Sequence, residues 1–171
     1  MDSFITPSPS KVGNGEGFIE LTPRSRKSST RLFKKHILNK GTLIYPGASG
    51  GKIDIDDNFI STLKSNFDRG VCDIVQVPLA NARNQHSEDP DRNIGEVVGI
   101  EEQDGKVYAI LDIRDEERAE KLGKTYLGAS AQIFLKYTDT STGENVGPTL
   151  GHVCITNRPY VTGLDEYEEI I

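Results

Sequence analysis

The stretch Thr125–Tyr137 reads TYLGASAQIFLKY, and it alternates two kinds of side chain with the period of a β-strand. Ser130 and Gln132 fall on one face of this expected strand, whereas Ala131 and Ile133 fall on the other. The serine is therefore on the less apolar face, between small alanine neighbours. The stretch predicts a half-buried strand that presents a serine hydroxyl with little side-chain bulk around it.

A second alternating stretch follows a turn-rich connector. Thr149–Pro159 reads TLGHVCITNRP, and its alternation places His152 on the more polar face. If the two strands formed a simple hairpin centred near Gly143, His152 would lie opposite Phe134. That position is four residues from Ser130, which is too far for contact at roughly 3.4 Å per residue. A contact between Ser130 and His152 therefore requires an offset register, a bulge or a connection that is not a hairpin.

The segments upstream predict further strands and two helices. Gln103-Asp104-Gly105 lies between two alternating apolar runs, which is a strong hairpin signal. A helix is expected from the cap Asp56 to Gly70, which ends it. The other expected elements are strands in 31–38, 42–46 and 73–79 and a short surface helix in 114–123. Strands dominate, so we expect an α+β, β-rich fold: a closed or nearly closed antiparallel barrel flanked by helices.

Composition limits the class of protein. The chain has 171 residues, with 20 Lys and Arg against 26 Asp and Glu, and thus a net charge of −6. This acidic balance argues against nucleic acid as a partner, and no apolar run is long enough to span a membrane. Two cysteines are too few for a disulfide scaffold. We expect a flexible N-terminal arm at 1–29, one folded domain at 30–165 and an acidic tail at 166–171.

Only three histidines, His36, His86 and His152, are available for imidazole chemistry. We expect His36 at the surface. His86 lies in the polar loop 80–93, and a loop of this length inside a compact domain is often functional. A serine hydroxyl such as that of Ser130 is a weak nucleophile that needs a base within hydrogen-bonding distance, and an imidazole suits that task.

Metal binding is a competing interpretation of the same residues. His86, His152 and Cys154 could hold a metal ion, although their spacing matches no metal-binding motif. Free cysteines are more often small core residues. The GASGG turn at 47–51 lacks the lysine and the following helix of a phosphate loop. We expect neither a metal nor a cofactor, and a small metal-dependent hydrolase stays open as an alternative.

The order of five segments carries a family resemblance. In this order the chain resembles the prohead maturation proteases of tailed bacteriophages, over about residues 31–165. The segments are LIYPGASGGKIDIDDNFISTLKSNF (43–67), VPLANARNQH (77–86), IGEVVGI (94–100), YLGASAQI (126–133) and GHVCITNRPYVTGL (151–164). The motifs are short, so the resemblance depends on their order and spacing.

The resemblance implies roles for single residues. His86 falls at the catalytic histidine and Ser130 at the nucleophile. His152 stands where some relatives carry an acidic residue, and here the chain is similar to the herpesvirus assemblins, whose triad is His, Ser, His. Arg158 lies near functional arginines of the assemblins, which implies a part in stabilising the oxyanion. A neutral His152 lacks the negative charge that stabilises an imidazolium, so we expect slower catalysis than with an aspartate.

The resemblance also implies a biological setting. We expect a serine endopeptidase that cleaves scaffold segments, the major capsid protein precursor and itself. It would act inside the prohead in the host bacterial cytoplasm, with weak homodimerisation and without a nucleic acid, membrane or cofactor. The alternatives are a non-catalytic scaffold or capsid-assembly domain, and a metal-dependent hydrolase that uses His86, His152 and Cys154.

Overall fold

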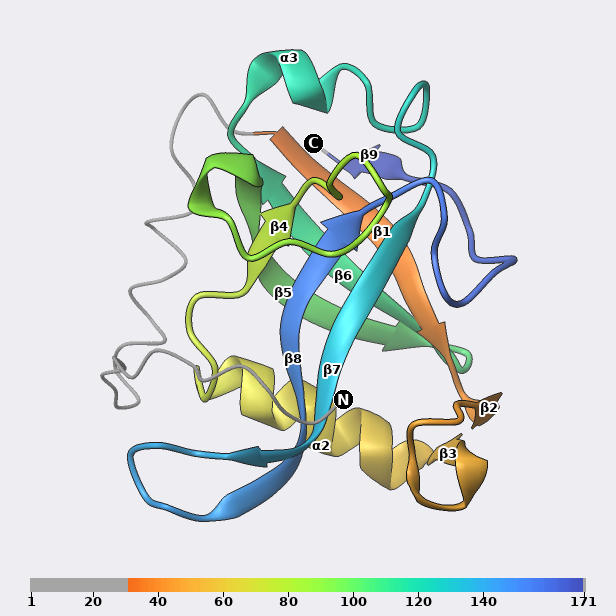
Figure 1. Cartoon of the computed structure of the whole chain (residues 1–171), viewed down its shortest axis with the longest axis vertical. Helices are drawn as coiled ribbons and strands as arrows, with labels where there is room; N and C mark the ends of the chain where they lie inside the picture. The colour runs from red at the N-terminus through yellow and green to blue at the C-terminus, as the bar shows by residue number, and fades with distance from the viewer. Residues whose placement is uncertain (1–30, 171) are drawn as a thin grey trace.

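A seven-stranded sheet forms the body of the molecule, together with a two-stranded sheet (Figure 1). The computed structural model describes residues 31–170, so the arm expected at 1–29 lies outside the described residues. In chain order the elements are β1 (Arg31–Asn39), β2 (Gly41–Ile44), the 3-10 turn η1 (Ser49–Gly51), β3 (Lys52–Ile55), α2 (Asp57–Asp68), β4 (Gln76–Pro78), the 3-10 turn η2 (Pro90–Arg92), β5 (Asn93–Gln103), β6 (Lys106–Ile113), α3 (Glu116–Ala119), β7 (Ala129–Thr138), β8 (Asn145–Ile155) and β9 (Glu168–Ile170).

The fold is α+β and rich in strands, as the sequence predicts. The strand order of the large sheet is β7-β8-β4-β5-β6-β1-β9, and β2 pairs with β3. The sheet is mixed and not purely antiparallel, because β4 runs parallel to β8 with Gln76 opposite His152. The pairings among residues 31–170 do not close into a barrel, since β7 and β9 stand at the two ends of the order.

Local sequence signals explain the two clearest elements. Asp104 and Gly105 take positive φ (53° and 81°) between β5 and β6, a conformation that the Asp-Gly pair favours in two-residue hairpin turns. Asp56 caps α2 by accepting a hydrogen bond from the Phe59 amide (2.8 Å). The chain turns away at Gly70, where φ is 70°. Both predictions are confirmed, and no helix in the described part of the chain is long and apolar enough to cross a membrane.

Three strands differ from the sequence prediction. The strand expected at 73–79 is shorter: β4 begins only at Gln76 and ends at Pro78, and Leu79 forms a single bridge with Ile155. β3 and β9 have no counterpart in the prediction. β9 lies within the expected acidic tail and pairs with β1, where the Arg31 guanidinium donates to both carboxylate oxygens of Glu169 (2.8 Å each). The charged tail thus adds a short strand to the edge of the large sheet.

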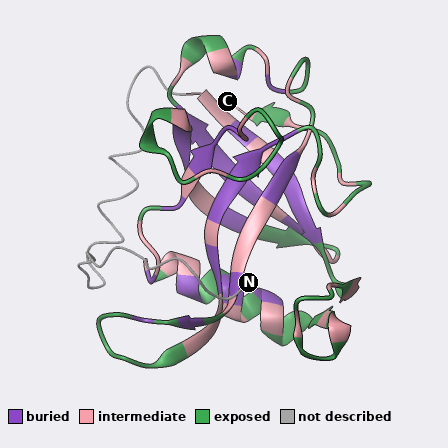
Figure 2. Cartoon of the chain, viewed as in Figure 1, coloured by how far each residue is buried: buried purple, intermediate pink, exposed green. Residues whose placement is uncertain are grey.

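Burial concentrates in the centre of the large sheet (Figure 2). The main apolar cluster joins sheet residues to α2, and Leu63 of this helix is fully shielded from solvent. Two polar residues of the hairpin β7–β8 lie at similar depth: Ser130 is 8 % exposed and His152 is 2 % exposed. Burying a polar group costs free energy unless it forms hydrogen bonds, so the partners of these two side chains are informative.

Candidate active site

The register of β7 and β8 decides which polar side chains lie together. Ser130 is opposite Cys154, and Gln132 is opposite His152. The pairing is offset by two residues from the simple hairpin, and bulges interrupt it, first between Gln132 and Ile133. Residues directly opposite one another share a face, so Ser130 and His152 are diagonal neighbours on one face, about 7–8 Å apart between Cα atoms. Of the connections considered from the sequence, the structure has the offset register with bulges.

The loop 80–93 brings His86 to this same face. His86 Nδ1 lies 2.7 Å from His152 Nε2, and the two rings are tilted by 46°. The backbone of the next residue, Ser87, lies close enough to the Cys154 thiol to influence its pKa. Because Cys154 is the direct cross-strand partner of Ser130, the loop crosses the face that carries the serine. Three residues far apart in the sequence therefore gather on one face of the β7–β8 hairpin.

Side-chain hydrogen bonds within the loop hold its shape. Asn81 Oδ1 accepts hydrogen bonds from the amides of Arg83 (2.8 Å) and Gln85 (3.1 Å). In turns of this kind the Asn side-chain oxygen accepts hydrogen bonds from backbone amides that have no partner in a strand or helix. At the other end, Arg92 Nε donates to the carbonyl of Leu79 (2.9 Å), which ties the two ends of the loop together. These contacts fix the segment that leads into His86.

A carboxylate extends the pair of imidazoles. Glu88 Oε2 lies 3.0 Å from His152 Nδ1. An ionised carboxylate can only accept a hydrogen bond, so His152 Nδ1 carries the hydrogen and its Nε2 carries a lone pair. His86 Nδ1 must then be the donor of the 2.7 Å contact. In this tautomer His86 Nε2 holds a lone pair that can take a proton.

The electrostatics keep both imidazoles neutral. Burial, together with the neighbouring His86, lowers the pKa of His152 to about 3. Burial also lowers the pKa of His86 below its ordinary value of 6.5. The contact between His152 and Glu88 is consequently a hydrogen bond from a neutral ring to a carboxylate. At neutral pH both rings are thus in the uncharged state that a general base needs.

Ser130 lies on the same face of the β7–β8 hairpin as His152. Its side chain lies in the wall of an apolar cavity, and no hydrogen bond within residues 31–170 joins its Oγ to His86. Hydrogen bonds between nucleophile and base are often long in unliganded enzymes and shorten when substrate binds. The structure therefore brings His86 and His152 into contact and places Ser130 on the same face of the hairpin, diagonally across from His152.

Two other residues singled out from the sequence lie elsewhere. Arg158 is exposed in the turn after β8, and its amide donates to Thr156 Oγ1 (3.0 Å); its part in stabilising an oxyanion stays a prediction. His36 is only 2 % exposed, and its expected surface position is wrong. His36 Nδ1 accepts a hydrogen bond from the Asp165 amide (2.9 Å), which anchors the segment after β8 to β1.

The metal-binding interpretation of His86, His152 and Cys154 finds little support in this geometry. The two imidazoles direct nitrogens at each other instead of at a common point. Burial raises the pKa of the Cys154 thiol to about 12, whereas a metal ligand must be a thiolate. Within residues 31–170 no group of three or more His, Cys, Asp or Glu side chains is placed to hold a metal ion.

Comparisons with known proteins add no identification. No family model, curated protein or solved structure matches this chain. The functional argument therefore depends on the residues and their geometry.

Sequence reasoning missed one residue of this set. Glu88 is two positions after His86, but a carboxylate in a polar loop is common and carries no signal by itself. What distinguishes Glu88 is its contact with a ring nitrogen 64 positions away. The pair His86 and Glu88 can be recognised as part of a site only once the buried His152 is known to face the loop.

Proposed function

We propose that this protein is a serine endopeptidase of the prohead maturation type, with Ser130 as nucleophile and His86 as general base. The observation that carries the proposal is the hydrogen-bonded chain from His86 through His152 to Glu88. It supplies an oriented neutral imidazole beside a serine, which is the arrangement that serine hydrolysis needs. The resemblance to phage proteases, carried by segment order, points to the same residues.

The proposed reaction has two stages. His86 Nε2 takes the proton from Ser130 Oγ while Oγ bonds to the carbonyl carbon of a peptide. The C–N bond then breaks, the proton passes from His86 to the leaving amine, and an acyl-enzyme remains. In the second stage a water molecule gives its proton to His86 and attacks the ester, which releases the new carboxylate and returns the proton to Ser130.

Glu88 changes the expected energetics of a His-His pair. A neutral His152 offers no charge to stabilise the His86 imidazolium, but a carboxylate bonded to its far nitrogen does. The Glu88 side chain is 55 % exposed, so water weakens its field. We therefore expect stabilisation that exceeds that of an isolated His152 and is smaller than that of a buried aspartate in direct contact.

The family resemblance extends the proposal to substrates and setting. The substrates are scaffold segments, the major capsid protein precursor and the enzyme's own ends, cleaved inside the prohead in the host bacterial cytoplasm, with weak homodimerisation. As for the fold, β1 and β7 come close without pairing. We propose that the sheet corresponds to an assemblin-like barrel that is open at this seam.

Co-expression with a capsid precursor tests the function. Wild type should shorten the precursor, and Ser130→Ala should leave it intact, while the exposed serine substitution Ser65→Ala should behave as wild type. Mass spectrometry of the products identifies the cut. If Ser130→Ala shortens the precursor as well as wild type does, the proposal is wrong. If neither shortens it and assembly is normal with both, the non-catalytic assembly domain is favoured.

A further inference from the structure

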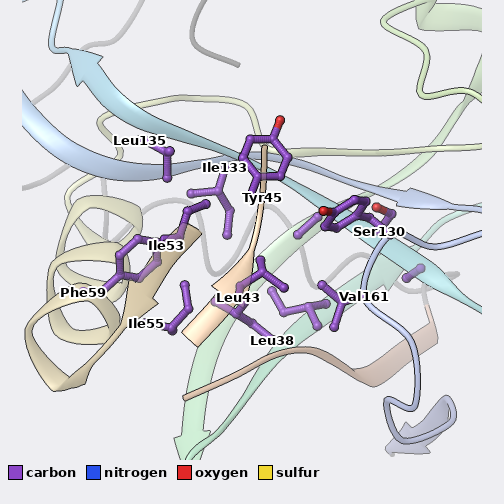
Figure 3. A pocket seen from close by; sticks show the side chains of 14 residues that line it. Leu38, Leu43, Tyr45, Ile53, Ile55, Phe59, Ser130, Ile133, Leu135 and Val161 are labelled. Carbon is purple, nitrogen blue, oxygen red and sulfur yellow. The ribbon is translucent and has the colours of Figure 1, made fainter. Parts of the chain in front are cut away.

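An apolar cavity of about 230 Å³ lies against Ser130 (Figure 3). It is bounded by β7, by the end of β1, by the β2–β3 sheet and by the start of α2. None of its lining residues is charged, and its polar side chains are Ser130 and two tyrosines, Tyr45 and Tyr160. Its apolar walls include Leu43, Ile53, Phe59, Ile133 and Leu135. An apolar cavity of roughly 150 Å³ already accommodates benzene, so this one has room for a large side chain.

The mouth of the cavity exposes apolar surface. The rings of Tyr45 and Tyr160 meet edge to face, with centroids 5.6 Å apart. Tyr160 donates a hydrogen bond to the carbonyl of Ile44 (2.7 Å), which fixes the ring at the rim. Tyr160 is nevertheless 53 % exposed and Ile44 is 66 % exposed. Neighbouring exposed apolar side chains at a cavity rim are typical of a binding surface.

The position of the cavity in the sheet suggests the shape of its occupant. β7 is an end strand of the large sheet, so one of its edges pairs with no strand among residues 31–170. An edge of this kind offers backbone groups to an extended peptide, whose alternate side chains then point to opposite faces. The neighbours of Ser130 on this strand, Ala129 and Ala131, line the cavity and are small.

We propose that this cavity binds a bulky apolar side chain, such as Leu or Phe, of an extended peptide whose cleaved bond lies at Ser130. This inference rests on the proposed peptidase function and adds its substrate preference. Ser130 supplies the connection, because it lines the cavity and also shares a face of the hairpin with His152. The other β7 residues of the cavity wall belong to the opposite face, which the alternate side chains of an extended peptide at the strand edge can reach. A charged side chain would lose its hydration in this uncharged cavity and should be rejected.

Binding is measured on the full chain carrying Ser130→Ala, which prevents cleavage. The probes are capped nine-residue peptides of Gly, Ser and Ala in which the central residue is Ala, Leu, Phe, Asp or Lys. Because only one side chain is bulky, the peptide selects its own register. We expect the Leu and Phe peptides to bind at least about tenfold more tightly than the Ala peptide, from the apolar surface buried. The Asp and Lys peptides should bind no better than Ala.

A filled cavity provides the matched comparison. Leu43→Trp, added to Ser130→Ala, should abolish the preference for Leu and Phe. Leu127→Trp makes the same change at a side chain that is 56 % exposed and outside this cavity, and it should keep the preference. Thermal melting shows whether Leu43→Trp is folded, and Leu135→Phe replaces it if it is not. Equal binding of all peptides, or a preference that survives filling, overturns the inference.

The failure of this inference is distinguishable from failure of the proposed function. If the wild type reacts with a fluorophosphonate at Ser130 but peptide binding shows no apolar preference, the proposed peptidase function stands and the inference about the cavity is wrong. If the protein prefers Leu and Phe peptides but does not react with the fluorophosphonate, the cavity binds peptides and the proposed peptidase function is wrong.

Discussion

At the scale of residues, the hydrogen-bonded chain from His86 to Glu88 determines which nitrogen of each imidazole carries the hydrogen. Glu88 accepts from His152, His152 accepts from His86, and His86 is left with a lone pair on Nε2. The order follows from one fact, that an ionised carboxylate has no hydrogen to donate. Removing the carboxylate therefore removes the reason for the tautomers of both imidazoles.

Glu88→Gln tests this chain. The amide keeps the size of the side chain but loses the charge, so kcat should fall on the order of tenfold, less than the roughly 10²–10⁴-fold expected for loss of the general base itself. KM should change little, because the lost charge acts on the imidazoles that carry the proton. The acidic limb of kcat/KM should also move to lower pH, since the carboxylate favours protonated imidazole. Steady-state kinetics over pH measures all three.

The control for Glu88 is an exposed glutamate on α3. Glu117→Gln removes the same charge at a distance from the histidines and should leave kcat and the pH profile unchanged. Equal effects of both substitutions would show that net charge, and not the contact with His152, matters.

Acid should destabilise the protein through His152. Its pKa is about 3 in the fold, below the ordinary value of 6.5, so the unfolded chain takes up a proton that the folded chain refuses. Stability contributed by the neutral ring is complete above pH 6.5 and falls progressively as pH drops toward 3. The loss amounts to a few kcal/mol, at 1.36 kcal/mol per pKa unit.

Urea unfolding at pH 7, 5 and 4 measures this loss. His152→Gln cannot titrate, so its free energy of unfolding should depend less steeply on pH than that of wild type over this range, whatever its absolute stability. A wild-type slope that is unchanged by the substitution would mean that other groups cause the acid sensitivity.

At the scale of elements, the loop 80–93 and the hairpin β7–β8 build the site together. The hairpin presents Ser130 and His152 on one face, and the loop covers that face with His86. The loop contains only the single 3-10 turn η2, so its side-chain contacts determine how accurately His86 is held.

Asn81→Ala tests the contribution of the loop. It removes two hydrogen bonds to loop amides, each worth about 1 kcal/mol. Because the affected groups are exposed, water replaces part of the loss and the melting temperature should change little. The position of His86 should become less defined, so kcat/KM should fall by about threefold to tenfold through misorientation.

Asn58→Ala, at an exposed position of α2, is the matched control and should leave both the melting temperature and kcat/KM unchanged. A large fall in melting temperature with normal kcat/KM would contradict this role.

These elements differ in how far the sequence predicts them. The β5–β6 turn and α2 follow from local signals, because Asp104-Gly105 and the Asp56 cap act within a few residues. The register of β7 and β8 does not, since the bulge after Gln132 has no local sequence mark. β9 pairs with β1 from the far end of the chain, and Arg31 contacts Glu169 there across 138 positions. Contacts of that range are decided by tertiary packing.

At the scale of the whole molecule, the large sheet brings the candidate residues together, with Ser130 on its end strand β7. The sequence identified His86, His152 and Ser130 as candidates, and the fold brings two of them into contact and the third to the same face. It did not indicate Glu88 or the cavity, because both arise from segments that meet only in the folded chain. The mixed sheet also departs from the antiparallel barrel, owing to the parallel pairing of β4 with β8.

Reaction with a fluorophosphonate tests the central claim, that Ser130 is activated by His86, without any knowledge of the natural substrate. The reagent bonds covalently to an activated serine, and peptide mass spectrometry locates it. Wild type and Ser65→Ala should be labelled at Ser130 at equal rates, while Ser130→Ala should not be labelled and His86→Ala should be labelled at least about 10²-fold more slowly. Labelling of Ser130 at the wild-type rate in His86→Ala, or no labelling of the wild type, would contradict the account.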